Sequence, residues 1–366
     1  MTKQRVVVVD GVASYWGGHV AERLVAEPDL HVIGLDTAPP RQSSGLDFIQ
    51  VDIRNPLLVE LLKEEQVDTY LHLAFLESDR PVEKVFDYNV MGTMKVLSAC
   101  AEAGVKRVLL KSSTLVYGAQ STNSAFLYED HPLNAKRNYG TVRDLVEIEN
   151  FCSAFRGQWP EVKLTILRFA PIIGPTVETA LTRFLRDDTA PMLLGFDPVM
   201  QLIHENDVVS ALTYAAVSDV TGTYNVAASG AMPLYKLTGL AGKLPLPVLH
   251  PIAYLGESFL GPQFTVMDFD YLRYPCVGDL QRMRDELGFQ PVYTAEEAVR
   301  EFATLRKEKA TASAMTPQEA EEERLRSIIE RRKHLRAQMA AGGSAHRQSR
   351  EHTKAEVTQG IADSSR

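Results

Sequence analysis

A glycine-bearing segment near the start of the chain has the residue types and spacing of a turn that binds a dinucleotide. Residues 10–18 read DGVASYWGG and follow a run of β-branched residues. A pyrophosphate at such a turn needs a tight bend, a close backbone approach and free N–H groups at the start of a helix. Ser14 stands where a middle glycine is expected, but serine still permits a close approach and adds a hydroxyl. We predict cofactor contacts from Gly11, Ser14, Tyr15, Trp16 and Gly17; a glycine turn without a ligand is the alternative.

An aspartate at the end of the second predicted strand bears on which dinucleotide binds. Asp36 lies 25 residues after Gly11. A carboxylate there accepts hydrogen bonds from a ribose diol and repels a 2′-phosphate, which favours NAD over NADP. The alternative is a turn aspartate ahead of two prolines. Asp52 and Ile53 close the third predicted strand, and we expect them to flank the adenine.

These residues need a sheet to position them, and strand and helix patterns alternate over the first 168 residues. Short apolar runs predict strands at residues 5–10, 31–35, 46–51, 69–73, 107–111 and 163–167. Helical stretches separate most of these strands, including residues 19–26, 85–103 and 139–155. The alternation predicts an α/β fold, a Rossmann-type doubly wound parallel sheet with helices on both faces.

The pattern loosens after residue 168, where prolines become frequent. We assign residues 1–168 to an NAD-binding Rossmann domain and residues 169–303 to a smaller C-terminal substrate-binding lobe. Residues 201–228 contain a predicted helix and strand, and we expect them to pack back onto the Rossmann domain.

Residues 304–366 form a charged tail with a helix signal of its own. Residues 316–319 are a capping box with proline at the first helical position, and acidic side chains precede basic ones along the helix. Two glycines end the helix, and the composition from residue 344 onward is typical of disorder. Two interpretations stay open for this helix: a solvated helix, or a helix that binds a protein partner or forms a dimer.

Composition excludes several classes of protein. The formal net charge is -8, although the tail from residue 303 carries 13 Lys and Arg against 9 Asp and Glu. Since the body is therefore acidic, we expect no nucleic-acid partner. No apolar run reaches the roughly 20 residues of a membrane span, so we expect no membrane partner. The three cysteines are widely spaced, no signal-peptide pattern is present and no metal-ligand spacing occurs. We therefore expect a cytoplasmic protein without a metal site.

Several later segments occur in a recognisable order. They are residues 71–75, 89–93, 112–118, 138–143, 167–175, 202–208, 222–226 and 286–291. With these segments the chain resembles the extended short-chain dehydrogenase/reductase superfamily, specifically its NAD-dependent epimerase/dehydratase branch. The resemblance covers roughly residues 5–300 and implies a small-molecule substrate.

The resemblance implies a role for each of three residues in hydride transfer. Tyr139 would be the general base or acid for a secondary hydroxyl, and Ser113 would hydrogen-bond the reacting oxygen. The family's lysine, four residues after the tyrosine, is replaced here by Arg143. Arginine keeps the positive charge, but its planar fork differs from a compact ammonium group. The resemblance also implies a homodimer, and it adds cofactor contacts from Leu73, Ala74, Phe75, Asn89, Ser112, Tyr139, Arg143 and Phe169.

The substrate side departs from the sugar-nucleotide epimerases of this branch. Ala170 replaces their asparagine, Met200 and Gln201 replace their Arg-Asp pair, and their Arg-x-Gly-Asp diphosphate clamp is missing. We therefore predict an NAD-dependent oxidoreductase acting on a secondary hydroxyl, with a nucleotide sugar as one candidate substrate. Two alternatives stay open: a non-nucleotide hydroxyl substrate, and a catalytically weakened NAD-binding sensor or scaffold.

Overall fold

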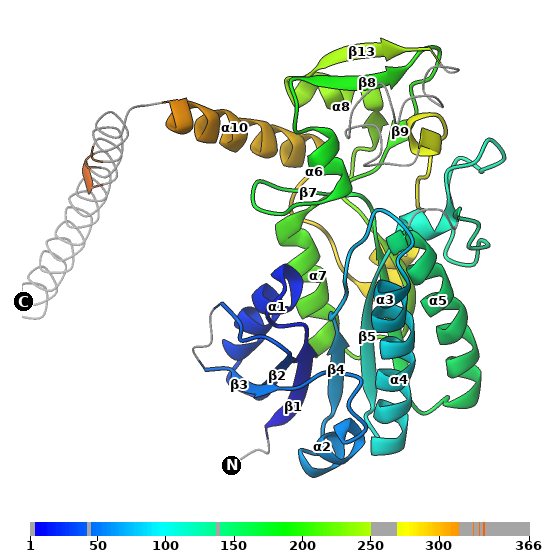
Figure 1. Ribbon diagram of the computed structural model, residues 1–366, viewed down its shortest axis with the longest axis vertical. Helices are drawn as coiled ribbons and strands as arrows, with labels where there is room; N and C mark the ends of the chain where they lie inside the picture. Colours follow the sequence, from blue (N-terminus) through cyan, green and yellow to red (C-terminus); the bar gives the residue numbers. More distant parts are fainter. Residues whose placement is uncertain are drawn as a thin grey trace, which may run out of the picture. The chain divides into compact units, whose positions relative to one another are not determined.

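Seven parallel strands form the central sheet of the protein (Figure 1). The computed structural model describes residues 4–41, 45–136, 140–249 and 269–314, together with residues 325, 329, 332 and 333. The strand order is β11-β6-β5-β4-β1-β2-β3. The strands are β1 (Arg5–Asp10), β2 (Leu30–Asp36), β3 (Asp47–Gln50), β4 (Thr69–His72), β5 (Arg107–Ser113), β6 (Lys163–Phe169) and β11 (Gly222–Val226). This arrangement confirms the predicted Rossmann-type fold class.

Helices cover both faces of this sheet. On one face α1 (Tyr15–Val25) and α7 (Glu205–Val217) pack against alternate residues of the central strands, such as Val7 and Val9. On the other face lie α2 (Leu58–Glu64), α4 (Gly92–Ala103) and α5 (Gly140–Gln158), which bury Val8 and Ile33 among other strand residues. Because side chains alternate along a strand, β-branched runs buried on both faces give this two-sided core.

The helix predicted over residues 85–103 is not continuous. A short helix α3 (Glu83–Phe86) leads into a π-helical turn (Asp87–Met91), and α4 follows. The turn directs Asn89 inward, where its side chain is fully buried and hydrogen-bonded to Leu76. The wider π turn is a local distortion that commonly accompanies functional sites.

A smaller lobe adjoins the carboxyl end of the sheet and is built from short elements. The strands pair as β7 (Ile172–Ile173) with β10 (Ile203–His204), β8 (Thr189–Leu193) with β13 (Leu244–Val248), and β9 (Val199–Met200) with β12 (Met232–Pro233). The helices of the lobe are α6 (Ala180–Phe184) and α8 (Leu234–Leu240). Short helical turns occur at Thr114–Tyr117, Phe269–Leu272 and Met283–Leu287. Buried side chains of the lobe form a separate apolar core that includes Phe184, Leu202 and Leu237.

Residues up to Thr304 form one compact unit, and residues from Leu305 onward form a second. The helix α10 (Ala295–Ala314) begins in the first unit, where Ala298, Val299 and Phe302 pack into the core of the lobe. The predicted tail helix and disordered end lie outside the described residues, apart from Leu325, Ile329, Arg332 and Lys333, which are helical and exposed. The domain boundary at residue 168 stays a prediction.

Candidate active site

The glycine turn between β1 and α1 is held so tightly that two of its positions require glycine. Gly11 has a φ of +70°, and a Cβ added there would lie 2.7 Å from the backbone N and Cα of Ala74. A Cβ on Gly17 would lie 2.2 Å from the carbonyl oxygen of Gly11. Ser14 is the N-cap of α1, and its hydroxyl accepts a hydrogen bond from the Gly17 N–H at 3.3 Å. The start of α1 is therefore pressed against the sheet edge, as an anion-binding turn requires.

Asp36 is joined to this turn. The Ala13 N–H donates to Asp36 Oδ2 at 2.9 Å, and the Ala38 N–H donates to Oδ1 at 3.1 Å. Each carboxylate oxygen can accept a further hydrogen bond. The predicted ribose contact is thus compatible with a structural role that fixes the end of β2 beside the turn.

A buried aspartate beside the turn was missed by the sequence analysis. Asp10 has no exposed surface, and it accepts hydrogen bonds from the N–H groups of Leu73 at 2.5 Å and Ala74 at 2.7 Å. The Tyr70 hydroxyl donates to it at 2.9 Å, and His72 Nδ1 lies 2.5 Å from its Oδ2. Asp10 therefore ties the end of β4 to the glycine turn. The signal was available, since a carboxylate that ends an otherwise apolar buried strand needs partners.

The residues predicted to flank the adenine are engaged with one another. Arg54 Nη2 donates to Asp52 Oδ2 at 2.7 Å, and Nη1 donates to Asp87 at 2.9 Å. The hydrogen bonds from Arg54 hold the pKa of Asp52 below its usual value. Ile53 is 2% exposed and contributes to the core beneath this edge.

Asn89 holds the loop that follows β4. Its Oδ1 accepts from the Leu76 N–H, and its Nδ2 donates to the Leu76 carbonyl and to Asp144 Oδ2, each at 2.9 Å. The same loop is joined to the start of α5, because Ser78 and Thr141 exchange backbone and hydroxyl hydrogen bonds of 2.8–3.0 Å. These bonds position Phe75 and the residues after it beside the sheet edge.

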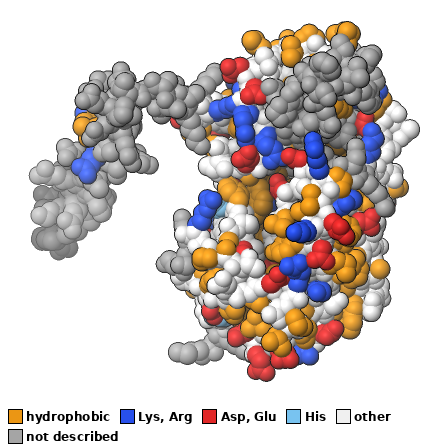
Figure 2. Space-filling model, in the orientation of Figure 1, with side chains coloured by type: hydrophobic (Ala, Val, Ile, Leu, Met, Phe, Trp, Pro, Cys, Tyr) orange, Lys and Arg blue, Asp and Glu red, His pale blue; other side chains and the backbone are white. Residues whose placement is uncertain are grey.

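A cavity of about 170 Å³ lies at the carboxyl edge of the sheet, beneath the lobe. Figure 2 shows hydrophobic side chains gathered in a hollow between the part that carries the sheet and the part that carries the lobe. The cavity reaches from Ser14 and Trp16 at α1 to Ser113 at the end of β5, and Leu181 and Tyr271 of the lobe close its other side. Seven predicted site residues line it: Ser14, Trp16, Leu73, Phe75, Ser112, Ser113 and Phe169.

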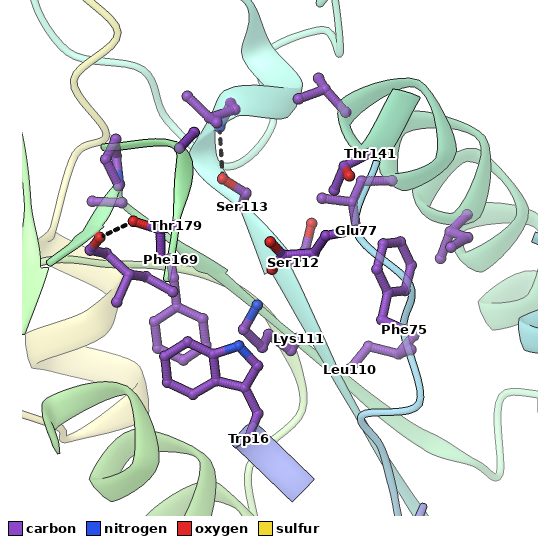
Figure 3. Close-up of a pocket in the computed structure, with 18 of the residues that line it drawn as sticks. Trp16, Phe75, Glu77, Leu110, Lys111, Ser112, Ser113, Thr141, Phe169 and Thr179 are labelled. Atoms are coloured by element: carbon purple, nitrogen blue, oxygen red, sulfur yellow. Dashed lines mark hydrogen bonds between the residues drawn. The ribbon is translucent and has the colours of Figure 1, made fainter. Parts of the chain in front are cut away.

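The two serines at the end of β5 have different surroundings. The Ser112 hydroxyl donates to Glu149 Oε1 at 2.5 Å, and Glu149 is in turn paired with buried Arg168 at 2.6 Å. The Ser113 hydroxyl oxygen accepts from the Leu115 N–H at 3.2 Å (Figure 3). Ser113 is therefore oriented by a single backbone bond, and its hydroxyl hydrogen can still be donated to a ligand.

The structure describes Arg143 but not Tyr139, so a shared site for the two residues stays a prediction. Arg143 donates from Nε and Nη2 to Asp144 Oδ1 at 3.0 and 2.8 Å, and its guanidinium lies 4.7 Å from the centre of the Phe86 ring. Arg143 does not line the cavity, whereas Thr141, Val142 and Leu145 of the same helix do. Tyr139 lies outside the described residues, immediately before α5.

The other predicted contacts lie around the cavity rather than on its wall. Tyr15 donates or accepts a 2.8 Å hydrogen bond with Thr176, and burial raises the pKa of its hydroxyl to about 12. The remaining predicted cofactor contacts that do not line the cavity are Gly11, Gly17, Asp36, Asp52, Ile53, Ala74 and Asn89.

Charged side chains also lie on the cavity wall. Glu77 and Asp79 come from the loop after β4, Lys111 from β5, and Arg183 from α6. Asp79 accepts a 2.8 Å hydrogen bond from Arg183. Only Lys111 had a clear signal, because a lysine interrupts an apolar strand directly before the two serines.

Two negative findings apply to the described residues. Within them, no group of three or more His, Cys, Asp or Glu side chains could hold a metal ion. No helix in the same part of the chain is both long and apolar enough to cross a membrane.

Comparison with known proteins agrees with this fold. The model of the NAD dependent epimerase/dehydratase family matches residues 7–227. An uncharacterised protein of Mycobacterium tuberculosis is 33% identical over 312 residues, which cover 81% of this chain and 83% of that protein. The UDP-glucose 4-epimerase of Lactobacillus helveticus is 30% identical over 184 residues, which cover 48% of this chain and 54% of the epimerase.

Solved structures of the same kind share the fold. The UDP-glucose 4-epimerase of Thermotoga maritima, solved with UDP-glucose, has a TM-score of 0.64 at 18% identity and covers 83% of this chain and 99% of its own. The dTDP-glucose 4,6-dehydratase of Bacillus anthracis, solved with NAD, has a TM-score of 0.63 at 17% identity and covers 83% and 97%. The predicted NAD cofactor agrees with the family description. On the family match and the extent of the mycobacterial relative, the chain belongs to the NAD dependent epimerase/dehydratase family.

Proposed function

We propose that this protein is an NAD-dependent oxidoreductase of the epimerase/dehydratase type that acts on a secondary hydroxyl of a nucleotide sugar. One observation carries the proposal: a single cavity joins the N-terminus of α1, at Ser14 and Trp16, to Ser113 at the end of β5. A predicted dinucleotide-binding turn and a candidate reaction centre thus share one cavity, which is what hydride transfer needs.

The residues around the turn fit NAD. No side chain fits at Gly11, which lies against the backbone after β4, or at Gly17, which lies against the carbonyl of Gly11. The turn therefore has the tightness that a bound pyrophosphate needs. The negative charge of Asp36 favours a free ribose diol over a 2′-phosphate. When bound, NAD supplies the acceptor and donor of hydride for the substrate carbon.

The chain's own residues would handle the proton. Tyr139 takes the proton of the substrate hydroxyl as the carbon is oxidised, and returns it when the ketone is reduced. Ser113 donates its hydroxyl hydrogen to the reacting oxygen, since its own oxygen already accepts from Leu115. Thr179, Leu181 and Tyr271 of the lobe form the wall opposite the sheet, and we assign them to the substrate.

The support for a nucleotide sugar comes from similarity to the UDP-glucose 4-epimerase of Lactobacillus helveticus. The protein, freed of bound nucleotide, is titrated with NAD and NADP and then incubated with UDP-glucose, UDP-galactose, UDP-glucuronic acid and dTDP-glucose. Chromatography of the sugar nucleotides and absorbance at 340 nm together detect epimerised, dehydrated and oxidised products. Tight NAD binding without turnover of any member of the panel would contradict the substrate class and leave the cofactor assignment intact.

Replacement of the proposed base tests the chemistry. We expect Tyr139→Phe to lower the turnover rate by about two orders of magnitude or more, because the variant lacks the hydroxyl proposed to take the substrate proton, while the affinity for NAD changes little. Tyr128→Phe is the matched control, since Tyr128 is an exposed tyrosine on the same segment of the chain. Equal turnover by Tyr139→Phe and the wild type would remove Tyr139 from the mechanism.

A second candidate is a catalytically weakened NAD-binding sensor or scaffold. The hydrogen bonds between Arg143 and Asp144 favour it, because they hold the guanidinium away from the cavity wall. This candidate predicts that NAD binds while no hydroxyl substrate of any class is turned over.

A further inference from the structure

Lys111 places an amine in the floor of the cavity, on the strand that carries Ser113. It lies two residues before Ser113 on β5, so the two side chains leave the same face of the sheet, about 7 Å apart along the strand. This is the face that packs against α1, because Leu109 belongs to the core shared with that helix. In Figure 3 the amine lies between the Trp16 indole and the side chains of Ser112 and Glu77.

The described residues stabilise the positive charge of this amine only weakly. Lys111 Nζ lies 5.1 Å from the centre of the Trp16 ring, and no ion pair joins it to an acidic residue in the described part of the chain. Burial lowers the pKa of Lys111, and the more distant charge of Glu77 opposes that shift. The nearby Glu149 is already paired with Arg168, and Asp79 with Arg183. A half-buried lysine without a carboxylate partner is costly, which suggests that a ligand completes its surroundings.

The path of a bound dinucleotide crosses this amine. A pyrophosphate bound at the start of α1 would lie beside Trp16, and a nicotinamide that reacts next to Ser113 would lie at the end of β5. Lys111 contacts Trp16 and shares a strand face with Ser113. A cofactor that follows this path would therefore have its nicotinamide half beside the amine. The nicotinamide ring is positively charged when oxidised and neutral when reduced, whereas the two phosphates are the same in both forms.

We propose that Lys111 selects the redox state of the cofactor, its amine lying against the nicotinamide half and favouring NADH over NAD⁺. The inference rests on the proposed function in one respect, namely that NAD binds in this cavity. Repulsion between two like charges a few ångströms apart, partly screened, corresponds to about a tenfold difference in affinity. Because binding favours the reduced cofactor, oxidation of a substrate hydroxyl inside the cavity becomes more favourable by the same factor.

Binding measurements test the assignment without a substrate. The wild type, Lys111→Met, Lys111→Arg and the exposed control Lys63→Met are freed of nucleotide and titrated calorimetrically with NAD⁺ and NADH. We expect the ratio of NADH to NAD⁺ affinity to fall about tenfold in Lys111→Met and to persist in Lys111→Arg and Lys63→Met. A ratio in Lys111→Met within twofold of the wild-type ratio would overturn the proposal.

A measurement on the wild type alone covers the case in which Lys111→Met does not fold. Lysines are reductively methylated with formaldehyde and cyanoborohydride at increasing NAD⁺ or NADH, and the extent at Lys111 and Lys63 is read by peptide mass spectrometry. We expect both nucleotides to protect Lys111 and neither to protect Lys63, with about tenfold less NADH than NAD⁺ needed for half protection. Equal protection by both nucleotides, or none, would contradict the selection. Calorimetry that detects neither nucleotide bound to the wild type would instead overturn the proposed function itself.

Discussion

At the residue scale, we expect the negative charge of Asp36 to determine the preference for NAD over NADP. Asp36→Asn retains an acceptor oxygen for the Ala13 or Ala38 N–H but removes the charge that repels a 2′-phosphate. We expect the affinity for NADP relative to NAD to rise about tenfold or more. Calorimetric titration with both nucleotides measures this ratio, and Asp29→Asn at the exposed turn before β2 is the control. An unchanged ratio would leave Asp36 with its structural role alone.

Lys111 also provides a stability prediction with a defined pH dependence. Burial lowers the pKa of Lys111 in the folded protein below its unfolded value near 10.5. Below the folded pKa the folded state carries a penalty for burying the charge, and this penalty disappears as pH rises towards the unfolded value. We therefore expect Lys111→Met to raise the free energy of unfolding by about 0.5–2 kcal/mol at neutral pH.

The measurement is urea unfolding of both proteins between pH 7 and pH 10. The difference between Lys111→Met and the wild type should shrink as pH rises, because only the wild type has this group to titrate. Lys63→Met, an exposed change on α2, should leave the stability within about 0.5 kcal/mol at each pH. A gap that widens with pH would show that the amine is stabilised in the folded state.

At the scale of the elements, hydrophobic pattern was sufficient where an element is regular. The runs at residues 107–111 and 163–167 predicted strands that the structure extends to Ser113 and Phe169. The hydrophobic pattern did not predict the backbone conformation where side-chain hydrogen bonds determine it. The π turn at Asp87–Met91 is an example, because Asn89 accepts a hydrogen bond from the distant Leu76 N–H. The helix α10 was missed although Thr294 and Glu297 form reciprocal capping bonds at its start.

One buried ion pair at the wall of the cavity joins three elements, and we expect it to contribute strongly to the stability of the protein. Glu149 of α5 and Arg168 of β6 are 2% and 6% exposed, and Ser112 of β5 donates to the same carboxylate. We expect Glu149→Leu to destabilise the protein by about 3–5 kcal/mol, because it leaves a buried guanidinium without its charge partner.

A double-mutant cycle with Arg168→Leu separates the pair from its surroundings. We expect the double variant to lose less free energy of unfolding, by urea titration, than the two single variants added together. Glu102→Gln on the exposed face of α4 is the control and should change stability by less than about 0.5 kcal/mol. Strict additivity would mean that each side chain acts through other contacts.

At the scale of the whole molecule, the sequence predicted a lobe beside the sheet but not which of its residues face the cavity. Asp79 and Arg183 lie 104 residues apart and come into contact only because α6 folds over the loop after β4. No local sequence pattern predicts this contact, since a single aspartate and a single arginine are common on any protein surface. The glycine turn was predictable because all its contacts lie within one strand–turn–helix unit and the next strand. The homodimer expected from the family stays a prediction.

The Arg183–Asp79 pair spans the cavity between the lobe and the sheet, and we expect it to slow the release of the cofactor. The two side chains are 23% and 48% exposed, so water screens the pair and its contribution should not exceed about 1 kcal/mol. That corresponds to at most about a fivefold faster dissociation of NADH in Arg183→Ala, with little change in stability. Stopped-flow fluorescence of bound NADH measures the rate.

The partner residue provides the control for this prediction. Asp79→Ala should give a similar increase in the rate of NADH dissociation, and NADH should leave the double variant no faster than either single one, because the same contact is lost in all three. If the two increases multiply instead, the residues act on the cofactor separately and the pair does not hold the lobe against the sheet.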